Sequence, residues 1–105
     1  MPARSSPRRY EFHPGADEDF FAALRFYLES ESAEVAQNFE AEIRRSLERL
    51  LRYPEIAPAI GRKGVRRMVL SGFPYNVHYV VAGDAIRVLA VAHQSRRPGY
   101  WIDRR

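Results

Sequence analysis

The chain has 105 residues, which is enough for one small domain and leaves no material for a second core. Apolar residues make up 46% and charged residues 29%, a balance typical of a folded protein rather than a disordered one. The sequence has no cysteine, which excludes disulfides and thiolate chemistry, and it has no apolar run near the roughly 20 residues that span a bilayer.

Charge is divided unevenly between the two halves of the chain. Residues 1–52 carry eight arginines and ten acidic residues, whereas residues 53–105 carry nine basic and three acidic residues. Lys63 is the single lysine. Because arginine binds carboxylates and phosphates in planar, bidentate contacts, the C-terminal half suits an acidic protein surface or nucleic acid. A coding bias towards arginine would explain the Arg/Lys ratio but not this asymmetry.

At the N-terminus, prolines and serines without an apolar stripe predict a disordered basic tail over residues 1–7, followed by a single domain over residues 8–105. This basic start lacks the apolar core of a signal peptide, so we expect a cytoplasmic protein. The alternation over residues 8–13, with Tyr10 and Phe12 on one face, predicts a short strand.

Two amphipathic helices are predicted next. The first begins near Pro14, and the second begins after Ser32 as its N-cap and ends at Tyr53. The short connection between them predicts an antiparallel hairpin, and neither helix can bury its apolar stripe without a sheet to cover it. The stripes include Phe20, Leu24, Phe39 and Ile43.

After a loop rich in proline and glycine, three strands are predicted over residues 65–71, 75–81 and 85–92. Short turns between them favour an antiparallel meander, and the nearly continuous apolar character of the third strand favours a central position. The order is β-α-α-β-β-β. We expect an α+β domain with the helical hairpin packed on one face of a small antiparallel sheet and basic residues clustered around the partly covered opposite face.

The histidines allow two interpretations. His93, at the end of the last strand, is either a general base for a ribose hydroxyl or a residue that hydrogen-bonds the C-terminal tail and fixes its path. We expect His78 to have a structural or surface role and His13 to contact the turn before the first helix. Three histidines without carboxylates at ligand spacing favour no metal site, and without a glycine-rich phosphate loop we expect no cofactor.

Basic and aromatic residues of the C-terminal half form the predicted partner-binding surface. The alternative is a solvated sheet face, with Trp101 buried against the sheet edge. Arg66 and Arg67 are neighbours in a strand and therefore point to opposite faces, so at most one of them faces a given partner. The complete predicted set is Arg66, Arg67, Arg87, Arg96, Arg97, Tyr100 and Trp101.

Several motifs, in this order and spacing, carry a family resemblance over residues 8–102. They are Tyr10-Glu11-Phe12-His13-Pro14, Gly64-Val65-Arg66-Arg67, Phe73-Pro74-Tyr75-Asn76-Val77-His78-Tyr79, and the strand ending at His93 with the following Arg96-Arg97-Pro98 and Tyr100-Trp101. Together they resemble the RelE/ParE toxins of bacterial type II toxin–antitoxin modules. The family fold is the one predicted above.

The resemblance implies a toxin that is held inactive by a cognate antitoxin, whose C-terminal segment binds as a helix and an extended strand. DNA would be contacted only indirectly, through the antitoxin. The predicted antitoxin groove lies beside the helical hairpin and comprises Phe20, Leu24, Phe39 and Ile43; the alternative is that these four residues belong to the core.

The family has two branches with different targets. One branch cleaves mRNA on the ribosome and needs several cations and an acid–base group, for which this chain offers His93, Arg96, Arg97 and Tyr100. The strand over residues 65–71 lacks a lysine and the following turn lacks an arginine, so the set is incomplete. The resemblance is therefore closer to the ParE branch, which inhibits DNA gyrase by binding and is not a nuclease. Ribosome-dependent mRNA cleavage and a non-toxic interaction module are the alternatives.

Overall fold

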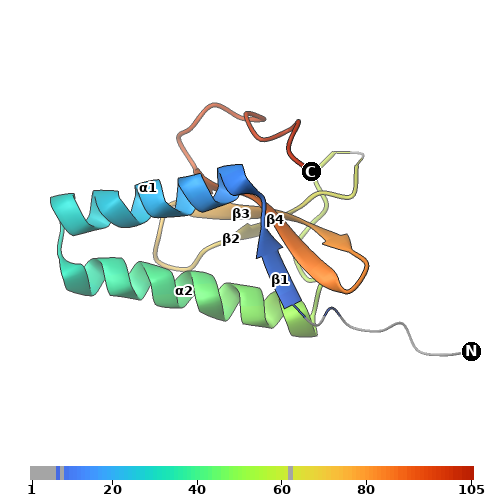
Figure 1. The fold of residues 1–105 in the computed structure, drawn as a ribbon, viewed down its shortest axis with the longest axis horizontal. Coiled ribbons are helices and arrows are strands. Elements are labelled where there is room, and N and C mark those ends of the chain that lie inside the picture. The colour runs from blue at the N-terminus through green and yellow to red at the C-terminus, as the bar shows by residue number, and fades with distance from the viewer. Residues whose placement is uncertain (1–6, 8, 62) are drawn as a thin grey trace, which may run out of the picture.

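The computed structural model describes residues 7, 9–61 and 63–105 (Figure 1). The predicted tail lies outside the described residues, apart from Pro7, which is buried. The order β-α-α-β-β-β is confirmed, and the observed strand ends differ from the predicted ones by no more than two residues. The elements are β1 (Arg9–Phe12), α1 (Pro14–Ser30), α2 (Ala33–Arg52), β2 (Arg66–Val69), β3 (Tyr75–Ala82) and β4 (Ala85–His93).

Side-chain caps set the start of both helices. The His13 Nδ1 atom accepts a hydrogen bond from the Gly15 amide at 2.9 Å, so His13 contacts the turn as predicted. The Ser32 Oγ atom accepts from the Val35 amide at 3.1 Å, which confirms Ser32 as the N-cap of α2. The two helices run side by side in opposite directions (Figure 1).

No helix within the described ranges has the length and apolar character needed to cross a membrane.

The four strands form one sheet in the order β1-β4-β3-β2. The predicted meander is confirmed, because β2 and β4 both pair antiparallel with β3, and β4 is central as expected. The expectation of a purely antiparallel sheet is wrong: β1 pairs parallel with β4, from Arg9 opposite Ala85 to Phe12 opposite Val88. Two antiparallel helices return the chain towards the start of β1, so β2 and, two reversals later, β4 run in the direction of β1.

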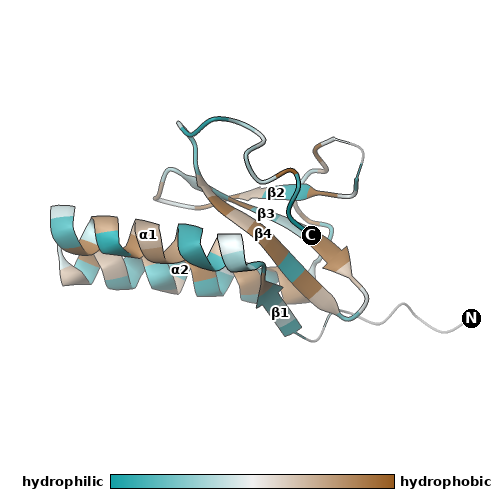
Figure 2. Ribbon diagram, turned by 45° about the horizontal axis from the view of Figure 1, so that its top comes forward, coloured by the Kyte–Doolittle hydropathy of each residue, from teal (hydrophilic) through white to brown (hydrophobic). Residues whose placement is uncertain are grey.

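The face of the sheet that carries the helices, here called the helix face, holds an aromatic core around Phe39. This side chain is fully buried, and its ring lies 5.9 Å from that of Phe20, 5.3 Å from Phe73 and 5.2 Å from Tyr75. Such stacked, tilted and edge-on ring pairs add to the free energy of burial. Figure 2 shows the apolar strand β4 lying against the helical layer.

The opposite face, here called the open face, has a smaller apolar cluster of its own. Leu89 and Ala90 are neighbours in sequence, yet both belong to this cluster. They can do so because the register between β3 and β4 shifts at His78 and Tyr79, which places an extra residue in β4. The cluster comprises Val65, Val80, Leu89, Ala90 and Trp101.

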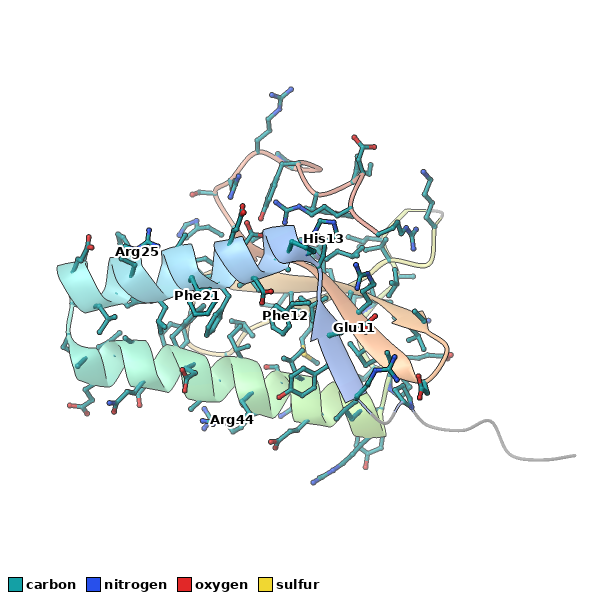
Figure 3. All side chains as sticks on the ribbon, viewed as in Figure 1. Glu11, Phe12, His13, Phe21, Arg25 and Arg44 are labelled. Atoms are coloured by element: carbon teal, nitrogen blue, oxygen red, sulfur yellow. The ribbon has the colours of Figure 1, made fainter. Side chains whose placement is uncertain are left out.

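Burial corrects part of the predicted antitoxin groove. Phe39 and Ile43 belong to the core between α2 and the sheet, at 0% and 4% exposure, and have no surface for a partner. Phe20 and Leu24 are half-buried against the same core. The exposed apolar side chains of α1 are instead their neighbours Phe21, Phe26 and Leu28, the first of which is labelled in Figure 3.

Candidate functional site

Residues 94–105, here called the C-terminal segment, lie against the sheet on the side away from the core around Phe39 and return to α1. Trp101 anchors this segment, because its ring stacks on the buried imidazole of His78 with centroids 4.4 Å apart and an interplanar angle of 24°. At 9% exposure Trp101 is buried, as the alternative interpretation expected, but it lies on the open face over β3 and not against the sheet edge. Its assignment to an exposed partner-binding surface is corrected, since burial of this large ring holds the segment in place.

A buried carboxylate on α1 fixes the other end of the segment. Asp19 accepts hydrogen bonds from the Val91 amide at 3.1 Å, from the Tyr100 hydroxyl at 3.0 Å and from an Arg104 guanidinium nitrogen at 2.8 Å. Arg96 lies 3.6 Å from its second oxygen. The sequence places Asp19 among first-turn acids and gives no sign of this role.

The Asp19 contact with Val91 follows from the unequal lengths of two strands. The register of β1 with β4 ends at Val88, so the later part of β4 has no strand beside it on that edge. Two side chains satisfy the backbone groups that a strand would otherwise pair: Asp19 accepts a hydrogen bond from the Val91 amide, and Arg104 donates to the Leu89 carbonyl at 3.0 Å. Gly15 allows this approach, because a Cβ atom there would lie 2.5 Å from the Arg104 guanidinium.

Tyr100 is held in the protonated form. Burial, and secondly the Asp19 carboxylate, raise the pKa of Tyr100 to about 12. The Arg96 guanidinium covers the ring at 3.7 Å from its centre. A hydroxyl with this pKa that already donates to Asp19 is a structural donor rather than an acid–base group poised near neutral pH.

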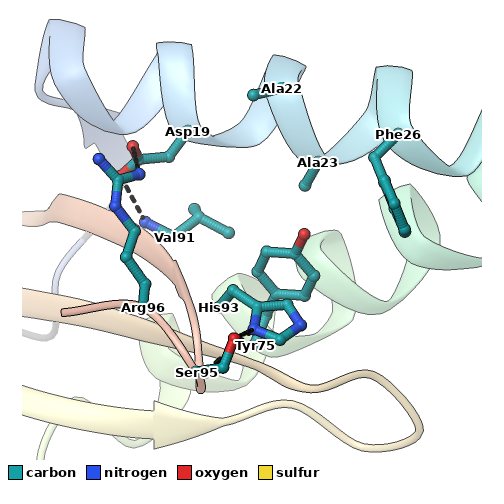
Figure 4. Close-up of a pocket in the computed structure, with 9 residues that line it drawn as sticks. All are labelled: Asp19, Ala22, Ala23, Phe26, Tyr75, Val91, His93, Ser95 and Arg96. Carbon is teal, nitrogen blue, oxygen red and sulfur yellow. Dashed lines mark hydrogen bonds and ion pairs between the residues drawn. The ribbon is translucent and has the colours of Figure 1, made fainter.

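His93 lines a cleft between α1 and the end of β4, here called the α1 cleft (Figure 4). Its Nδ1 atom accepts from the Ser95 amide at 3.0 Å and lies 2.7 Å from the Ser95 hydroxyl, so His93 does direct the path of the tail. The cleft has a volume of about 300 Å³ and is largely apolar apart from two polar pairs, Asp19 with Arg96 at one end and His93 with Ser95. Its apolar wall comprises Ala22, Ala23, Phe26, Tyr75 and Val91.

A second cavity, of about 210 Å³, opens on the other side of the C-terminal segment. We call it the arginine cavity. It brings together all four residues of the predicted nuclease set, His93, Arg96, Arg97 and Tyr100, and adds Arg67 from β2. Arg67 and Arg97 are exposed, and neither forms an ion pair with another described residue.

The structure places two predicted arginines elsewhere. Arg66 lies on the helix face, opposite in direction to Arg67 as predicted, and donates to the backbone carbonyls of Glu55 and Ala57 at 3.2 and 2.7 Å. Arg87 lies on the open face but bonds to Glu11 at 3.2 Å and to the Arg105 carbonyl at 3.0 Å. Fewer arginines are therefore available to a partner than the sequence predicts.

His78 sits beneath this surface as a neutral group. Burial, and secondly the charge of Arg67, lower the pKa of His78 to about 4. Its Nδ1 atom has no hydrogen-bond partner among the described residues. His78 therefore contributes an uncharged platform for Trp101, in agreement with a structural role.

Within the described ranges, no three histidine or acidic side chains are grouped as metal ligands.

Comparison with known proteins decides the family. The family described as ParE toxin of type II toxin–antitoxin system, parDE, matches residues 10–98. The chain belongs to this ParE toxin family. It is thus the toxin component of a type II toxin–antitoxin module, and the family implies a cognate antitoxin as its partner.

A solved structure has the same fold as this ParE-family toxin. The structure, described as a chromosomal ParDE toxin–antitoxin system from P. aeruginosa, aligns with a TM-score of 0.72 at 18% identity and covers 87% of this chain and 98% of the other. No curated protein matches the sequence. At this identity the likeness concerns the fold alone, so the target must be argued from the site.

Proposed function

We propose that this toxin acts by binding DNA gyrase through the open face of its sheet, without catalysing a reaction, and that it does so in the cytoplasm. The observation that carries the proposal is the state of the arginine cavity. Arg67 and Arg97 line it without an acidic partner among the described residues, while the remaining candidate groups are engaged within the molecule. Two such guanidinium groups, one on β2 and one on the C-terminal segment, suit carboxylates on a partner protein.

The antitoxin would occupy a different region. The α1 cleft, whose wall includes the exposed Phe26, offers an apolar surface beside the helical hairpin, and Arg96 lies at one end of it. An amphipathic helix that lays its apolar side chains along α1 would cover this surface. This proposal places the antitoxin at the α1 cleft, along Ala22, Ala23 and Phe26, rather than at the core residues Phe39 and Ile43.

A supercoiling assay tests the gyrase proposal. Purified toxin should inhibit supercoiling of relaxed plasmid by gyrase, and addition of the antitoxin should restore it. Unimpaired supercoiling at a large molar excess of toxin would contradict the proposal. Topoisomerase relaxation without gyrase serves as the control for a general effect on DNA.

One observation favours a second candidate function. His93, Arg96, Arg97 and Tyr100 meet around a single cavity, which is the arrangement that ribosome-dependent mRNA cleavage would need. Against it, the Tyr100 hydroxyl donates to Asp19 and the His93 Nδ1 atom accepts from Ser95. Primer extension on mRNA after toxin induction would reveal codon-linked cuts if the chain is a nuclease.

Normal growth on induction without antitoxin would instead indicate a non-toxic interaction module.

A further inference from the structure

A third cavity lies beside the arginine cavity, on the other side of Trp101 and at the outer end of the C-terminal segment. Its volume is about 270 Å³. Ligand pockets for drug-sized molecules and cofactors have volumes of roughly 300–1,000 Å³, so this cavity suits a single large side chain better than a cofactor. We call it the Trp101 pocket. Its main lining residues are Ile60, Lys63, Val65, Trp101, Ile102 and Arg105.

The walls of the Trp101 pocket are held in place before any partner binds. Arg105 donates to the Lys63 carbonyl at 2.7 Å, which ties the C-terminal segment to the loop before β2. Arg87 in turn donates to the Arg105 carbonyl at 3.0 Å. A cavity whose two walls are already joined loses little conformational freedom on binding, which favours affinity.

The Trp101 pocket has an apolar floor and a basic rim. Val65 and Trp101 are buried in the open-face cluster, whereas Ile102 is 58% exposed. The described lining residues include two cations, Lys63 and Arg105, and no acid. An apolar anchor that enters a pocket within a charged rim is the usual arrangement at the energetic centre of a protein–protein interface.

The same features argue against a nucleic acid as the occupant. Single-stranded nucleic acid is bound by stacking bases on exposed aromatic rings. The Trp101 ring is buried and stacks on His78, and the Tyr100 ring is covered by Arg96, so neither ring offers a stacking surface. The cations of the rim suit a phosphate as well as a carboxylate, but the apolar floor accepts a leucine or aromatic side chain and not a charged group.

From these observations we propose that the Trp101 pocket receives one large apolar side chain from an acidic segment of the toxin's target protein. Carboxylates on either side of that anchor would reach Lys63 and Arg105 on one side of Trp101 and Arg67 and Arg97 on the other. The inference rests on the proposed function, because it assigns this face to the target and the α1 cleft to the antitoxin. It adds that target recognition needs an apolar anchor as well as charge.

The pocket can be tested without gyrase by NMR on the full isotope-labelled chain. The probe is a short peptide with a central leucine flanked by glutamates, titrated to a large excess. We expect shifts at Val65 and Ile102 and a change in the fluorescence of Trp101, the single tryptophan. A peptide with alanine in place of leucine should bind about tenfold more weakly. Absence of shifts at the pocket, or equal binding of both peptides, would overturn the inference.

Matched variants then test the assignment to the target. Ile102→Glu places a charge in the pocket, and Ile56→Glu changes a residue of the same type and similar exposure, 53%, outside it. We expect Ile102→Glu to weaken gyrase binding at least tenfold, Ile56→Glu to leave it unchanged, and both to bind the antitoxin normally. Weaker antitoxin binding by Ile102→Glu would overturn the assignment. If the unmodified chain does not bind gyrase but does bind the leucine peptide, the gyrase proposal fails and the pocket stands.

Discussion

The two faces of the sheet are stabilised by different kinds of interaction. On the helix face, burial of aromatic and aliphatic side chains around Phe39 dominates. On the open face, a smaller apolar cluster is closed by Trp101. The C-terminal segment that carries Trp101 is tied to α1 and to the edge of β4 by a polar centre at Asp19. The first face is therefore stabilised by a large apolar core, whereas the second carries the exposed cations Arg67 and Arg97, and the segment that covers it is held by one buried carboxylate.

The helix face should be the more sensitive to loss of a single side chain. Phe39→Ala removes a fully buried ring and its contacts with Phe20 and Tyr75 and should lower the free energy of unfolding by about 3–5 kcal/mol. Urea denaturation followed by circular dichroism measures the change. Phe21→Ala, at a ring that is 55% exposed, is the control and should change it by less than about 1 kcal/mol. Equal losses in the free energy of unfolding for the two variants would contradict the assignment of Phe39 to the core.

The open face should respond to acid through His78. The pKa of His78 is about 4 in the folded chain and near 6.5 in the unfolded chain. Between these values the unfolded chain binds more protons, so the free energy of unfolding should fall as pH is lowered from 6.5 to 4, by on the order of 2–3 kcal/mol. His78→Phe keeps a ring against Trp101 and should remove this part of the pH dependence. An identical pH profile for the two chains would contradict a buried, neutral His78.

Loss of the Asp19 charge should loosen the C-terminal segment and leave the core around Phe39 in place. Asp19→Asn removes the charge that faces Arg96 and Arg104 and should cost about 1.5–3 kcal/mol. The pKa of Tyr100, about 12 in the unmodified chain, should fall because burial and the carboxylate both act less on it. NMR titration of the Tyr100 ring and hydrogen exchange of residues 94–105 measure both effects.

The exposed acid Asp17, two positions earlier on α1, provides the control. Asp17→Asn should leave the pKa of Tyr100 and the exchange of the C-terminal segment unchanged. If the two variants behave alike, Asp19 does not organise the open face.

Two arginines on opposite faces give the smallest expected difference in stability. Arg66→Met removes hydrogen bonds to the carbonyls of Glu55 and Ala57 and should cost about 1–2 kcal/mol. Arg97→Met, at a side chain without an ion pair among the described residues, should change the free energy of unfolding by less than about 0.5 kcal/mol. Thermal unfolding compares the two, and a larger loss for Arg97→Met would contradict its assignment as a free cation.

Local patterns predicted most of the fold. Helical spacing, the cap at Ser32 and the short turns between the last strands each act over a few residues, and all three were confirmed. The parallel pairing of β1 with β4 was missed, because it joins residues about 75 positions apart and depends on the direction in which the hairpin returns the chain. Periodicity carries no information about such a pairing.

The site was less predictable than the fold. Composition identified the basic C-terminal half, and strand alternation correctly separated Arg66 from Arg67. Neither pattern indicates that three of the arginines have partners within the molecule. Arg66 bonds to backbone carbonyls, Arg87 to Glu11 and Arg96 to Asp19, and none of these partners is a close neighbour in sequence. Asp19 was missed for the same reason. A carboxylate in the first turns of a helix has a sufficient local explanation, and its distant donors leave no mark in the sequence near it.

The double charge reversal Arg67→Glu with Arg97→Glu tests the central claim most directly, in the gyrase supercoiling assay with antitoxin binding measured in parallel. The substitutions leave the Asp19 contacts and the core around Phe39 in place. We expect the variant to fold and to bind the antitoxin normally but to lose inhibition of supercoiling by more than tenfold. Full inhibition by the variant would contradict the claim that the open face of the sheet recognises the target.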